Sequence, residues 1–370
     1  MSSKMVNRVI ISGGGTGGHI FPALAIADEI KKRNPKAEIL FVGARGRMEM
    51  EKIPQAGYEI IGLPIAGLQR KLTWKNLLLP FKLLRSFYLV LSVIRKFKPE
   101  IVIGVGGYAS GPTLQMAQLL GIPTLLQEQN SYPGKTNKIL AKKAKAICVA
   151  YPSMDRFFPE HKIHYLGNPV RSNLATDLNP LKADAAAFFG LDANKPTLLV
   201  IGGSLGALTL NESIFTGLEK FQNSNIQVLW QCGKSFEAKF LAGQNQLPTQ
   251  VKLLAFIQRM DFAYALADVI ISRAGALSVS ELALVGKPCI LVPSPNVAED
   301  HQTKNALSLV DQSAALLVKD AAARATLLDT CFNLLSDSAK QKELSGNLQK
   351  LALPEATQAI VNVCEKVITA

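Results

Sequence analysis

The chain has 370 residues, of which 48% are hydrophobic, and a formal net charge of +13. This length suits about two domains with sizeable cores. No apolar run reaches the roughly 18 residues of a membrane span, no signal-peptide core opens the chain, and the five scattered cysteines form no Cys-x-x-Cys pair. We therefore expect a cytoplasmic globular protein with reduced cysteines, not a membrane-spanning or disulfide-rich one.

The charge is unevenly distributed along the chain. Residues 1–170 hold 24 Lys and Arg against 10 Asp and Glu, whereas residues 171–370 hold 17 against 18. A basic half followed by a neutral half indicates an anionic partner for the first half.

The first predicted unit is a strand at residues 9–11, a glycine turn and a helix, with Pro22 expected at the first helical position. Such a unit presents backbone N–H groups to an anion. The spacing Gly13-x-Gly15-x-x-Gly18 matches the dinucleotide fingerprint, but no acid follows the next strand. Arg45 stands there and suits a 2′-phosphate, which leaves an NADP site open. His19 in place of a lysine excludes the P-loop.

His19 itself has two interpretations. It is either a surface or capping histidine, or a residue that transfers a proton or contacts phosphate beside the anion site.

A basic and apolar segment follows, because no acid occurs between Glu59 and Glu100. Pro80 is expected to start or kink a helix in it. Cations mixed with apolar side chains predict a surface that lies on an anionic membrane. A core helix with a solvated basic face is the alternative, and no module supports a nucleic-acid surface. The residues expected to contact the membrane are Leu77, Leu78, Phe81, Lys82 and Arg85.

A second glycine turn, Gly106-Gly107-Tyr108-Ala109-Ser110, follows a strand at residues 101–105. The next strand ends in Glu128-Gln129-Asn130. Alternating strands and helices predict a parallel sheet, and both glycine turns should open on its carboxyl edge.

The same architecture restarts in the second half, with a strand at residues 197–201 and a glycine turn at 202–207. We predict the α/β class with two Rossmann-like domains. Residues 1–169 form the first, residues 170–353 form the second, and a final helix at 354–370 packs back on the first.

Three motifs in the second half each allow two interpretations. Gly202-x-Ser204-x-Gly206 fits either a hydrolase nucleophile elbow, with Asp268 and His301 as partners, or a phosphate-binding turn. Glu281 either completes a capping box with Ser278 or accepts the hydroxyls of a ribose. The run Asp300-His301-Gln302 suits sugar hydroxyls or helix capping.

Taken together, these motifs closely resemble the MurG family of bacterial N-acetylglucosaminyltransferases along the whole chain. The matching stretches are Gly14-Gly15-Thr16-Gly17-Gly18-His19, Gly106-Gly107-Tyr108-x-Ser110-Gly111-Pro112, Glu128-Gln129-Asn130, Gly167-Asn168-Pro169-Val170-Arg171, Gly202-Gly203-Ser204-x-Gly206-Ala207, Arg273-x-Gly275-Ala276-Leu277-x-Val279-x-Glu281 and Asp300-His301-Gln302. The chain differs from the family pattern in having Ser278 for threonine and Ser131-Tyr132-Pro133 after Asn130.

The resemblance implies a GT-B fold with the active site in the cleft between the two domains. It implies an inverting transfer of N-acetylglucosamine from UDP-N-acetylglucosamine to lipid I, which yields lipid II for peptidoglycan. No cofactor and no tightly held metal are expected, since no Asp-x-Asp motif occurs. The expected location is the cytoplasmic face of the bacterial cell membrane, as a peripheral protein.

The resemblance also implies roles for individual residues, with His19 as our candidate for the catalytic base. The substrate-binding positions are Thr16, Gly17, Gly18, Asn130, Arg171, Ser204, Ile257, Ala276, Leu277, Ser278, Val279, Ser280, Glu281 and Gln302. By the family pattern, Glu281 holds the ribose, Ser204 the phosphate region and the backbone at Ile257 the uracil of the donor. Residues 276–281, with Gln302 and Asn130, lie on the sugar side, and Arg171 also belongs to the donor site. The positions expected to hold the acceptor diphosphate are Gly14, Gly15, Gly106, Gly107, Tyr108 and Ser110. The competing functions are an NADP-dependent oxidoreductase and a non-catalytic sugar-nucleotide or membrane-binding module.

Overall fold

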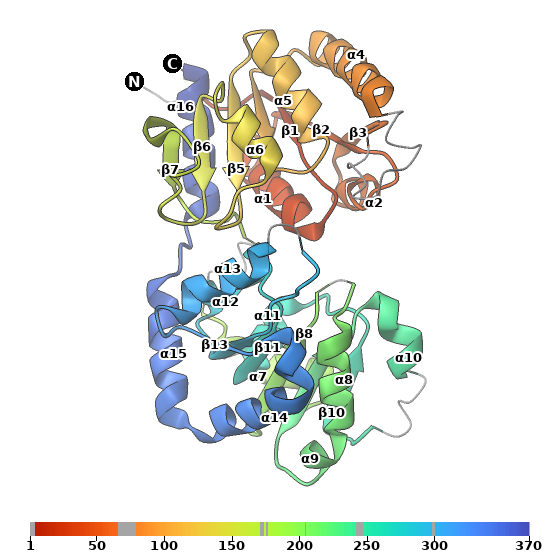
Figure 1. Cartoon of the computed structure of the whole chain (residues 1–370), viewed down its shortest axis with the longest axis vertical. Coiled ribbons are helices and arrows are strands. Elements are labelled where there is room, and N and C mark those ends of the chain that lie inside the picture. The colour runs from red at the N-terminus through yellow and green to blue at the C-terminus, as the bar shows by residue number, and fades with distance from the viewer. Residues whose placement is uncertain are drawn as a thin grey trace. The chain divides into compact units, whose positions relative to one another are not determined.

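The computed structural model describes residues 4–65, 79–170, 174, 177–203, 205–241, 247–297 and 300–369. The chain divides into two compact units (Figure 1). Unit 1 comprises Met1–Val170 and Glu355–Ala370, and unit 2 comprises Arg171–Pro354. Each unit is a parallel sheet with helices on both faces, which confirms the predicted class of two Rossmann-like α/β units.

Unit 1 contains a 7-stranded sheet in the order β3-β2-β1-β4-β5-β6-β7. All its pairs are parallel. The strands are β1 Arg8–Ser12, β2 Glu38–Ala44, β3 Glu59–Leu63, β4 Ile101–Gly104, β5 Thr124–Glu128, β6 Ala146–Val149 and β7 Ile163–Tyr165.

Helices cover both faces of this sheet because its strand residues alternate between two cores. Ile11 and Ile103 face α1, α2 and α16, whereas Ile10 and Val102 face α4, α5 and α6. The helices are α1 Gly17–Arg33, α2 Glu49–Gln55, α4 Leu79–Phe97, α5 Ser110–Leu119, α6 Lys135–Leu140 and α16 Ala356–Thr369.

Unit 2 contains a 6-stranded parallel sheet in the order β10-β9-β8-β11-β12-β13. The strands are β8 Thr197–Ile201, β9 Gln227–Gln231, β10 Val251–Leu254, β11 Val269–Ser272, β12 Cys289–Leu291 and β13 Leu316–Leu317. The helices are α7 Lys182–Phe189, α8 Leu208–Thr216, α9 Leu218–Gln222, α10 Glu237–Leu241, α11 Met260–Leu266, α12 Ala276–Val285, α13 His301–Val310, α14 Asp320–Ser336 and α15 Ser338–Lys350.

The first helix begins earlier than the sequence predicted. Helix α1 starts at Gly17, so Pro22 lies inside it and not at its first position. At this sixth position of the helix, proline has no N–H to donate to the carbonyl of Gly18, so α1 lacks one of its i→i−4 hydrogen bonds.

The last helix of the chain is part of unit 1. Helix α16 packs beside α1 and contributes Ile360, Val361 and Cys364 to the core. Arg33 of α1 donates to the carboxylate of Glu365 at 3.2 Å and to the carbonyl of Gln358 at 2.9 Å. Polar contacts thus reinforce apolar burial between two helices that are distant in sequence.

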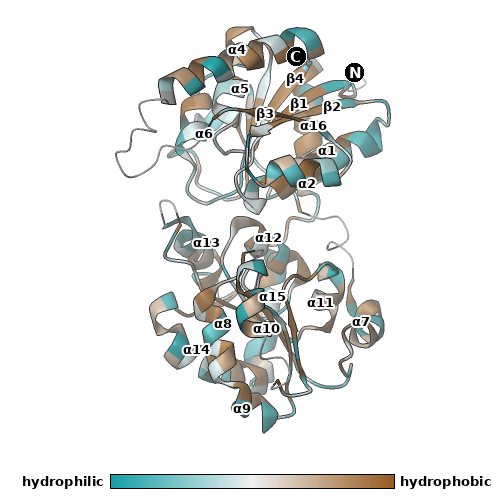
Figure 2. Ribbon diagram, turned by 90° about the vertical axis from the view of Figure 1, so that its right-hand side faces the viewer, coloured by the Kyte–Doolittle hydropathy of each residue, from teal (hydrophilic) through white to brown (hydrophobic). Residues whose placement is uncertain are grey.

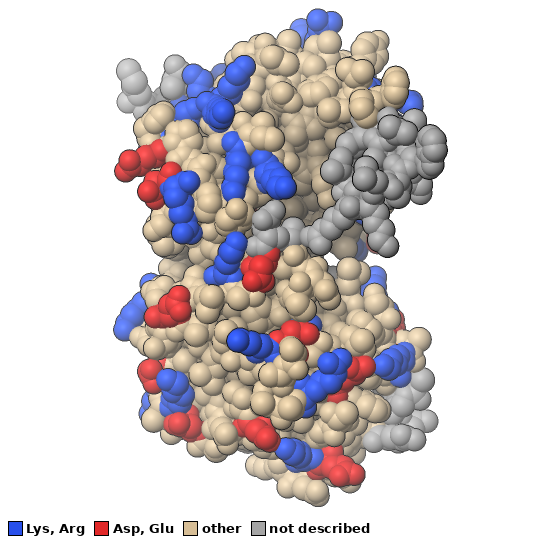
Figure 3. Space-filling view, in the orientation of Figure 1, with Lys and Arg blue, Asp and Glu red and all other residues tan. Residues whose placement is uncertain are grey.

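The excess of positive charge is visible on unit 1. On the face drawn in Figure 3, the charged residues of unit 1 are mainly Lys and Arg, with acids at one margin, whereas both signs are intermixed on unit 2. The strands of both sheets are largely hydrophobic, and α4 mixes apolar and polar residues along its length (Figure 2).

Candidate active site

In both units the strand order reverses direction beside the first strand. Strands β2 and β3 extend to one side of β1 and β4 to the other, and β8 has the same position between β9 and β11. In open parallel sheets, ligands bind outside the carboxyl ends of strands at such a switch point. The glycine turns of the sequence lie at these two places.

Two glycine loops of unit 1 touch at the switch point: loop 1, residues 13–16, and loop 2, residues 105–109. A Cβ added at Gly107 would lie 2.5 Å from the carbonyl oxygen of Gly14. One added at Gly13 would lie 2.8 Å from the carbonyl oxygen of Gly106. Glycine is therefore needed for the loops to approach this closely.

His19 lies between the two loops, in the first turn of α1. Its Nδ1 is 3.0 Å from the carbonyl oxygen of Gly14 and 3.3 Å from Oγ1 of Thr16. A carbonyl only accepts, so a hydrogen bond at this distance requires the tautomer of the neutral ring that carries its proton on Nδ1 and its lone pair on Nε2. A Cβ at Gly106 would lie 2.8 Å from Nε2, which places this nitrogen over loop 2.

The remaining residues predicted in these loops differ in accessibility. Thr16 is the exposed N-cap of α1, and its side chain makes no capping hydrogen bond. Gly17 and Gly18 follow in the first helical turn, and Tyr108 is 49% exposed. Ser110 is buried and donates its hydroxyl to the carbonyl of Gly107, so its contribution is to the shape of loop 2.

Glu49 is a site residue that the sequence reasoning missed. Its carboxylate is 1% exposed and accepts the N–H of Gly15 at 2.8 Å and the N–H of Ala44 at 3.0 Å. The N–H of Gly15, predicted to hold phosphate, is thus donated to a carboxylate. No short motif links positions 34 residues apart, so nothing in the sequence pointed to this contact.

The end of β5 is organised by Glu128. The carboxylate is 2% exposed and accepts N–H donors from Asn130, Gly134 and Asn137. Burial raises the pKa of Glu128, while these hydrogen bonds oppose the rise. Asn130, predicted to contact the sugar, also donates its side-chain amide to Glu128 at 3.3 Å, so this carboxylate positions it.

In unit 2 the loops after β8 and β9 touch in the same manner as those of unit 1. A Cβ at Gly206 would lie 2.0 Å from the carbonyl oxygen of Cys232, and one at Gly233 would lie 2.1 Å from the nitrogen of Gly206. Ser204, the predicted phosphate contact, lies outside the described residues.

Gln231, at the end of β9, connects the loops that follow β8 and β10. Its amide nitrogen donates to the carbonyl of Gly203 at 3.1 Å, and its amide oxygen accepts the N–H of Ile257 at 2.9 Å. Ile257 was predicted to contact the uracil through its backbone, and that N–H is donated to Gln231 here. Gln231 was not predicted, because a buried glutamine carries no sequence signature.

The predicted sugar-nucleotide residues of α12 form its first two turns. Gly275 is the N-cap and Ala276 the first helical residue, so Ser278 is not a cap and the capping-box alternative is wrong. Ala276 and Val279 are buried, whereas Leu277, Ser278 and Ser280 are partly exposed. Ser280 donates to the carbonyl of Ala276 at 3.1 Å.

Glu281 is partly exposed and accepts the hydroxyl of Tyr264 at 3.0 Å. Tyr264 is 1% exposed and comes from α11, so this contact orients the carboxylate from within the core. From α13, Gln302 accepts the N–H of Ser294 at 2.8 Å and thereby holds the loop after β12.

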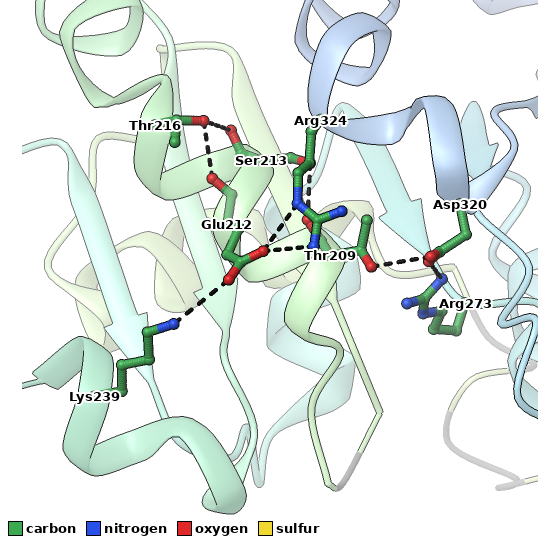
Figure 4. Close-up of polar contacts among 8 residues, drawn as sticks. All are labelled: Thr209, Glu212, Ser213, Thr216, Lys239, Arg273, Asp320 and Arg324. Atoms are coloured by element: carbon green, nitrogen blue, oxygen red, sulfur yellow. Dashed lines mark hydrogen bonds and ion pairs between the residues drawn. The ribbon is translucent and has the colours of Figure 1, made fainter.

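Arg273 braces the loop that leads into α12 (Figure 4). It donates to the carbonyl of Val292 at 3.0 Å and pairs with Asp320, which in turn accepts the hydroxyl of Thr209. These contacts link the loops after β11 and β12 to the starts of α8 and α14. A separate ion pair joins Arg324 to Glu212.

The hydrolase alternative fails on geometry. Asp268 accepts the N–H of Thr197 at 2.8 Å, which places it at the amino edge of the sheet. The turn after β8 and His301 of α13 follow the carboxyl ends of strands. A five-residue strand spans about 16 Å, so Asp268 cannot orient a histidine beside that turn.

The predicted membrane surface falls partly outside the described residues, as do Leu77, Leu78 and the donor-site Arg171. In α4, Phe81 is 71% exposed and Tyr88 is 73% exposed. Lys82 is half-buried and Arg85 is exposed beside them. Among the described residues, no helix is both long and apolar enough to cross a membrane.

Other features bear on cofactors and cysteines. Within the described ranges, no three His, Cys, Asp or Glu side chains are grouped as metal ligands. All five cysteines are unpaired and buried, and burial raises the pKa of Cys289 to about 12.

Arg45, the residue that suits a 2′-phosphate in the NADP alternative, donates its Nε–H to the carbonyl of Gly62 at 2.9 Å. A cavity of about 500 Å³ against β10 is lined by none of the predicted site residues.

Comparisons with known proteins agree along the whole chain. The model of the glycosyltransferase family 28 N-terminal domain matches residues 9–149, and that of the C-terminal domain matches residues 197–360. A UDP-N-acetylglucosamine--N-acetylmuramyl-(pentapeptide) pyrophosphoryl-undecaprenol N-acetylglucosamine transferase from Cytophaga hutchinsonii is 56% identical, over 100% of this chain and 99% of that protein. The enzyme of the same name from Bacteroides thetaiotaomicron is 55% identical over 95% of each chain.

The chain belongs to the MurG family. Among solved structures, that of Acinetobacter baumannii MurG is 31% identical and matches with a TM-score of 0.77, over 97% of this chain and 99% of that one. Membership of the MurG family confirms the expected transferase and favours it over the NADP-dependent oxidoreductase and the non-catalytic module.

Substituting loop glycines will measure the contact between loops 1 and 2. Gly107 and Gly15 have nearly equal positive φ angles, +90° and +89°, but only Gly107 has an atom within 4 Å of an added Cβ. Both alanine variants therefore incur similar backbone strain, and Gly107→Ala adds overpacking of about 1–3 kcal/mol. We expect Gly107→Ala to have the lower melting temperature in differential scanning fluorimetry; equal melting temperatures would contradict the contact.

Proposed function

We propose that this protein transfers N-acetylglucosamine from UDP-N-acetylglucosamine to N-acetylmuramyl-(pentapeptide) pyrophosphoryl-undecaprenol, lipid I, and so forms lipid II for peptidoglycan. The observation that carries the proposal is the identity of 55–56% over nearly the full length to enzymes named for these substrates. The two sets of polar groups, one at the carboxyl edge of each sheet, supply a donor site and an acceptor site.

The donor is assigned to unit 2. Glu281, held by Tyr264, is suited to accept both ribose hydroxyls, and the N-terminus of α12 is suited to the diphosphate. A uracil oxygen at the N–H of Ile257 would take the place of the Gln231 amide oxygen. Gln302 is assigned to the sugar, as is Asn130 of unit 1. Arg171 and Ser204 are assigned to the donor by the family pattern alone.

The acceptor diphosphate is assigned to loops 1 and 2. Glu49 already accepts the Gly15 N–H, so the remaining backbone donors of the two loops carry this role. The acceptor hydroxyl attacks the anomeric carbon with inversion and passes its proton to Nε2 of His19. Backbone donors and the N-terminus of α12 stabilise the charge that develops on the UDP leaving group.

The undecaprenol chain of such an acceptor is a lipid, so the enzyme must meet it at a membrane surface. We assign this contact to α4, where Phe81, Leu84 and Tyr88 are exposed at 71%, 66% and 73%. Their spacing places them along one stripe of the helix, with Lys82 and Arg85 adjacent to attract anionic lipid. The proposed location is peripheral, on the cytoplasmic face of the membrane.

Transfer of radiolabelled N-acetylglucosamine from the UDP donor to a lipid I analogue tests the function. We expect a radiolabelled lipid II product from the wild-type protein. His19→Ala should lower kcat by about 10²-fold or more, the usual contribution of a general base. No transfer by folded wild-type protein would refute the function, and a rate within a few-fold in His19→Ala would refute only the base.

The ribose contact is tested by Glu281→Gln, which keeps the side-chain shape but removes the charge. Charge-assisted hydrogen bonds contribute about 1.5–3 kcal/mol, so we expect UDP to bind roughly 10- to 100-fold more weakly by isothermal titration calorimetry. Glu343→Gln, an exposed position on α15, is the matched control and should bind UDP normally. An unchanged affinity in Glu281→Gln would rule out the ribose role.

Membrane contact is tested by the double variant Phe81→Ser/Leu84→Ser. Burial of each side chain in lipid is favourable by about 1.5–3 kcal/mol, so binding should weaken by at least about tenfold in co-sedimentation with phosphatidylglycerol vesicles. Phe188→Ser, at a residue of unit 2 that is 59% exposed, is the control and should co-sediment normally. Equal co-sedimentation of the double variant and the wild type would contradict the docking surface.

A further inference from the structure

The buried carboxylate of Glu49 has no role in the catalysis proposed above. It is the first residue of α2 and bonds with one oxygen to the Ala44 N–H, at the end of β2, and with the other to the Gly15 N–H in loop 1. Both carboxylate oxygens are therefore used to hold backbone at the edge of the sheet.

The space around this carboxylate is made by two glycines. A Cβ at Gly14 would lie 2.2 Å from the carboxylate carbon of Glu49, and one at Gly43 would lie 2.6 Å from its Cγ. Any larger residue at either position would expel the side chain. The glycines of loop 1 and of the end of β2 therefore leave the space that an acidic side chain at position 49 occupies.

The contact reaches His19 through a single peptide group. The Gly15 N–H that donates to Glu49 and the Gly14 carbonyl that lies 3.0 Å from Nδ1 of His19 belong to the same peptide plane. A carboxylate bonded to the N–H side of a peptide polarises it and makes its carbonyl a stronger acceptor. It also fixes the plane, and with it the direction in which the carbonyl points.

We propose that Glu49 is a positioning residue for His19, acting through the peptide between Gly14 and Gly15. The Glu49 carboxylate accepts the N–H of Gly15, and the carbonyl of Gly14 accepts the Nδ1–H of His19. The lone pair of Nε2 is then directed over Gly106. It is the arrangement of a carboxylate–histidine pair with a peptide inserted between the partners. The inference rests on the proposed function, in which Nε2 of His19 receives the acceptor proton.

The alternative is that Glu49 only braces the loop. A brace would affect stability and substrate affinity but would leave the imidazole tautomer unchanged. The tautomer is therefore the decisive readout, and it is seen in the ¹⁵N chemical shifts of the imidazole nitrogens. The chain has four histidines, and a spectrum of His19→Ala identifies the signals of His19.

The wild-type protein provides the first test, with no substitution at position 49. In ¹⁵N-histidine-labelled protein at a pH where His19 is neutral, we expect the Nδ1–H tautomer to predominate. Predominance of Nε2–H would overturn the proposal outright, even if every Glu49 variant failed to fold.

The second test is Glu49→Gln, which is nearly isosteric but offers one acceptor oxygen to two N–H donors. The Nε2–H tautomer of His19 should gain population, and kcat should fall roughly tenfold, part of the usual contribution of a general base, with KM changed less than twofold. Glu100→Gln is the matched control: that carboxylate also accepts two backbone N–H groups, of Asn7 and Arg8, but at the opposite end of β1.

The outcomes separate the two hypotheses. An unchanged tautomer in folded Glu49→Gln would refute the positioning role whatever the activity. A changed tautomer with an unchanged kcat would support the coupling between Glu49 and His19. It would refute the assignment of His19 as the catalytic base, which is part of the proposed function. Equal changes in Glu49→Gln and Glu100→Gln would show a general loss of sheet integrity and would overturn the specific role of Glu49.

Discussion

Direct backbone contact between neighbouring loops is the constraint on which both sites depend. In unit 1 the contact lies between Gly107 and Gly14, and in unit 2 between Gly233 and Gly206. At each place a side chain as small as alanine would force the loops apart. With no side chains between them, N–H groups and helix starts from two adjacent strands are concentrated at one point of the sheet edge.

Each unit then uses buried or partly buried polar side chains to keep these loops in place. Glu49 ties loop 1 to β2, and Glu128 holds the turn that carries Asn130. In unit 2, Gln231 and Arg273 do the same for the loops after β8, β10, β11 and β12. Backbone groups in such loops have no strand or helix partners, so buried side chains must satisfy them.

The sequence predicts the positions of the loops but not the side chains that support them. Glycine spacing after β-branched runs marks loops 1 and 2 because local geometry alone demands glycine there. Glu49 and Gln231 were missed because their partners are 34 and 26 residues away in the chain. Pro22 was misplaced because glycines are poor helix formers, and helix α1 nevertheless starts at Gly17.

The return of α16 to unit 1 has a consequence for the order of folding during synthesis. Unit 2 is continuous in sequence, so its whole core has been synthesised before α16 emerges from the ribosome. The core of unit 1 stays open along one side until Ile360 and Cys364 arrive. The half that is translated first is therefore completed last, and its apolar face beside α1 is exposed to chaperones and proteases in the interval.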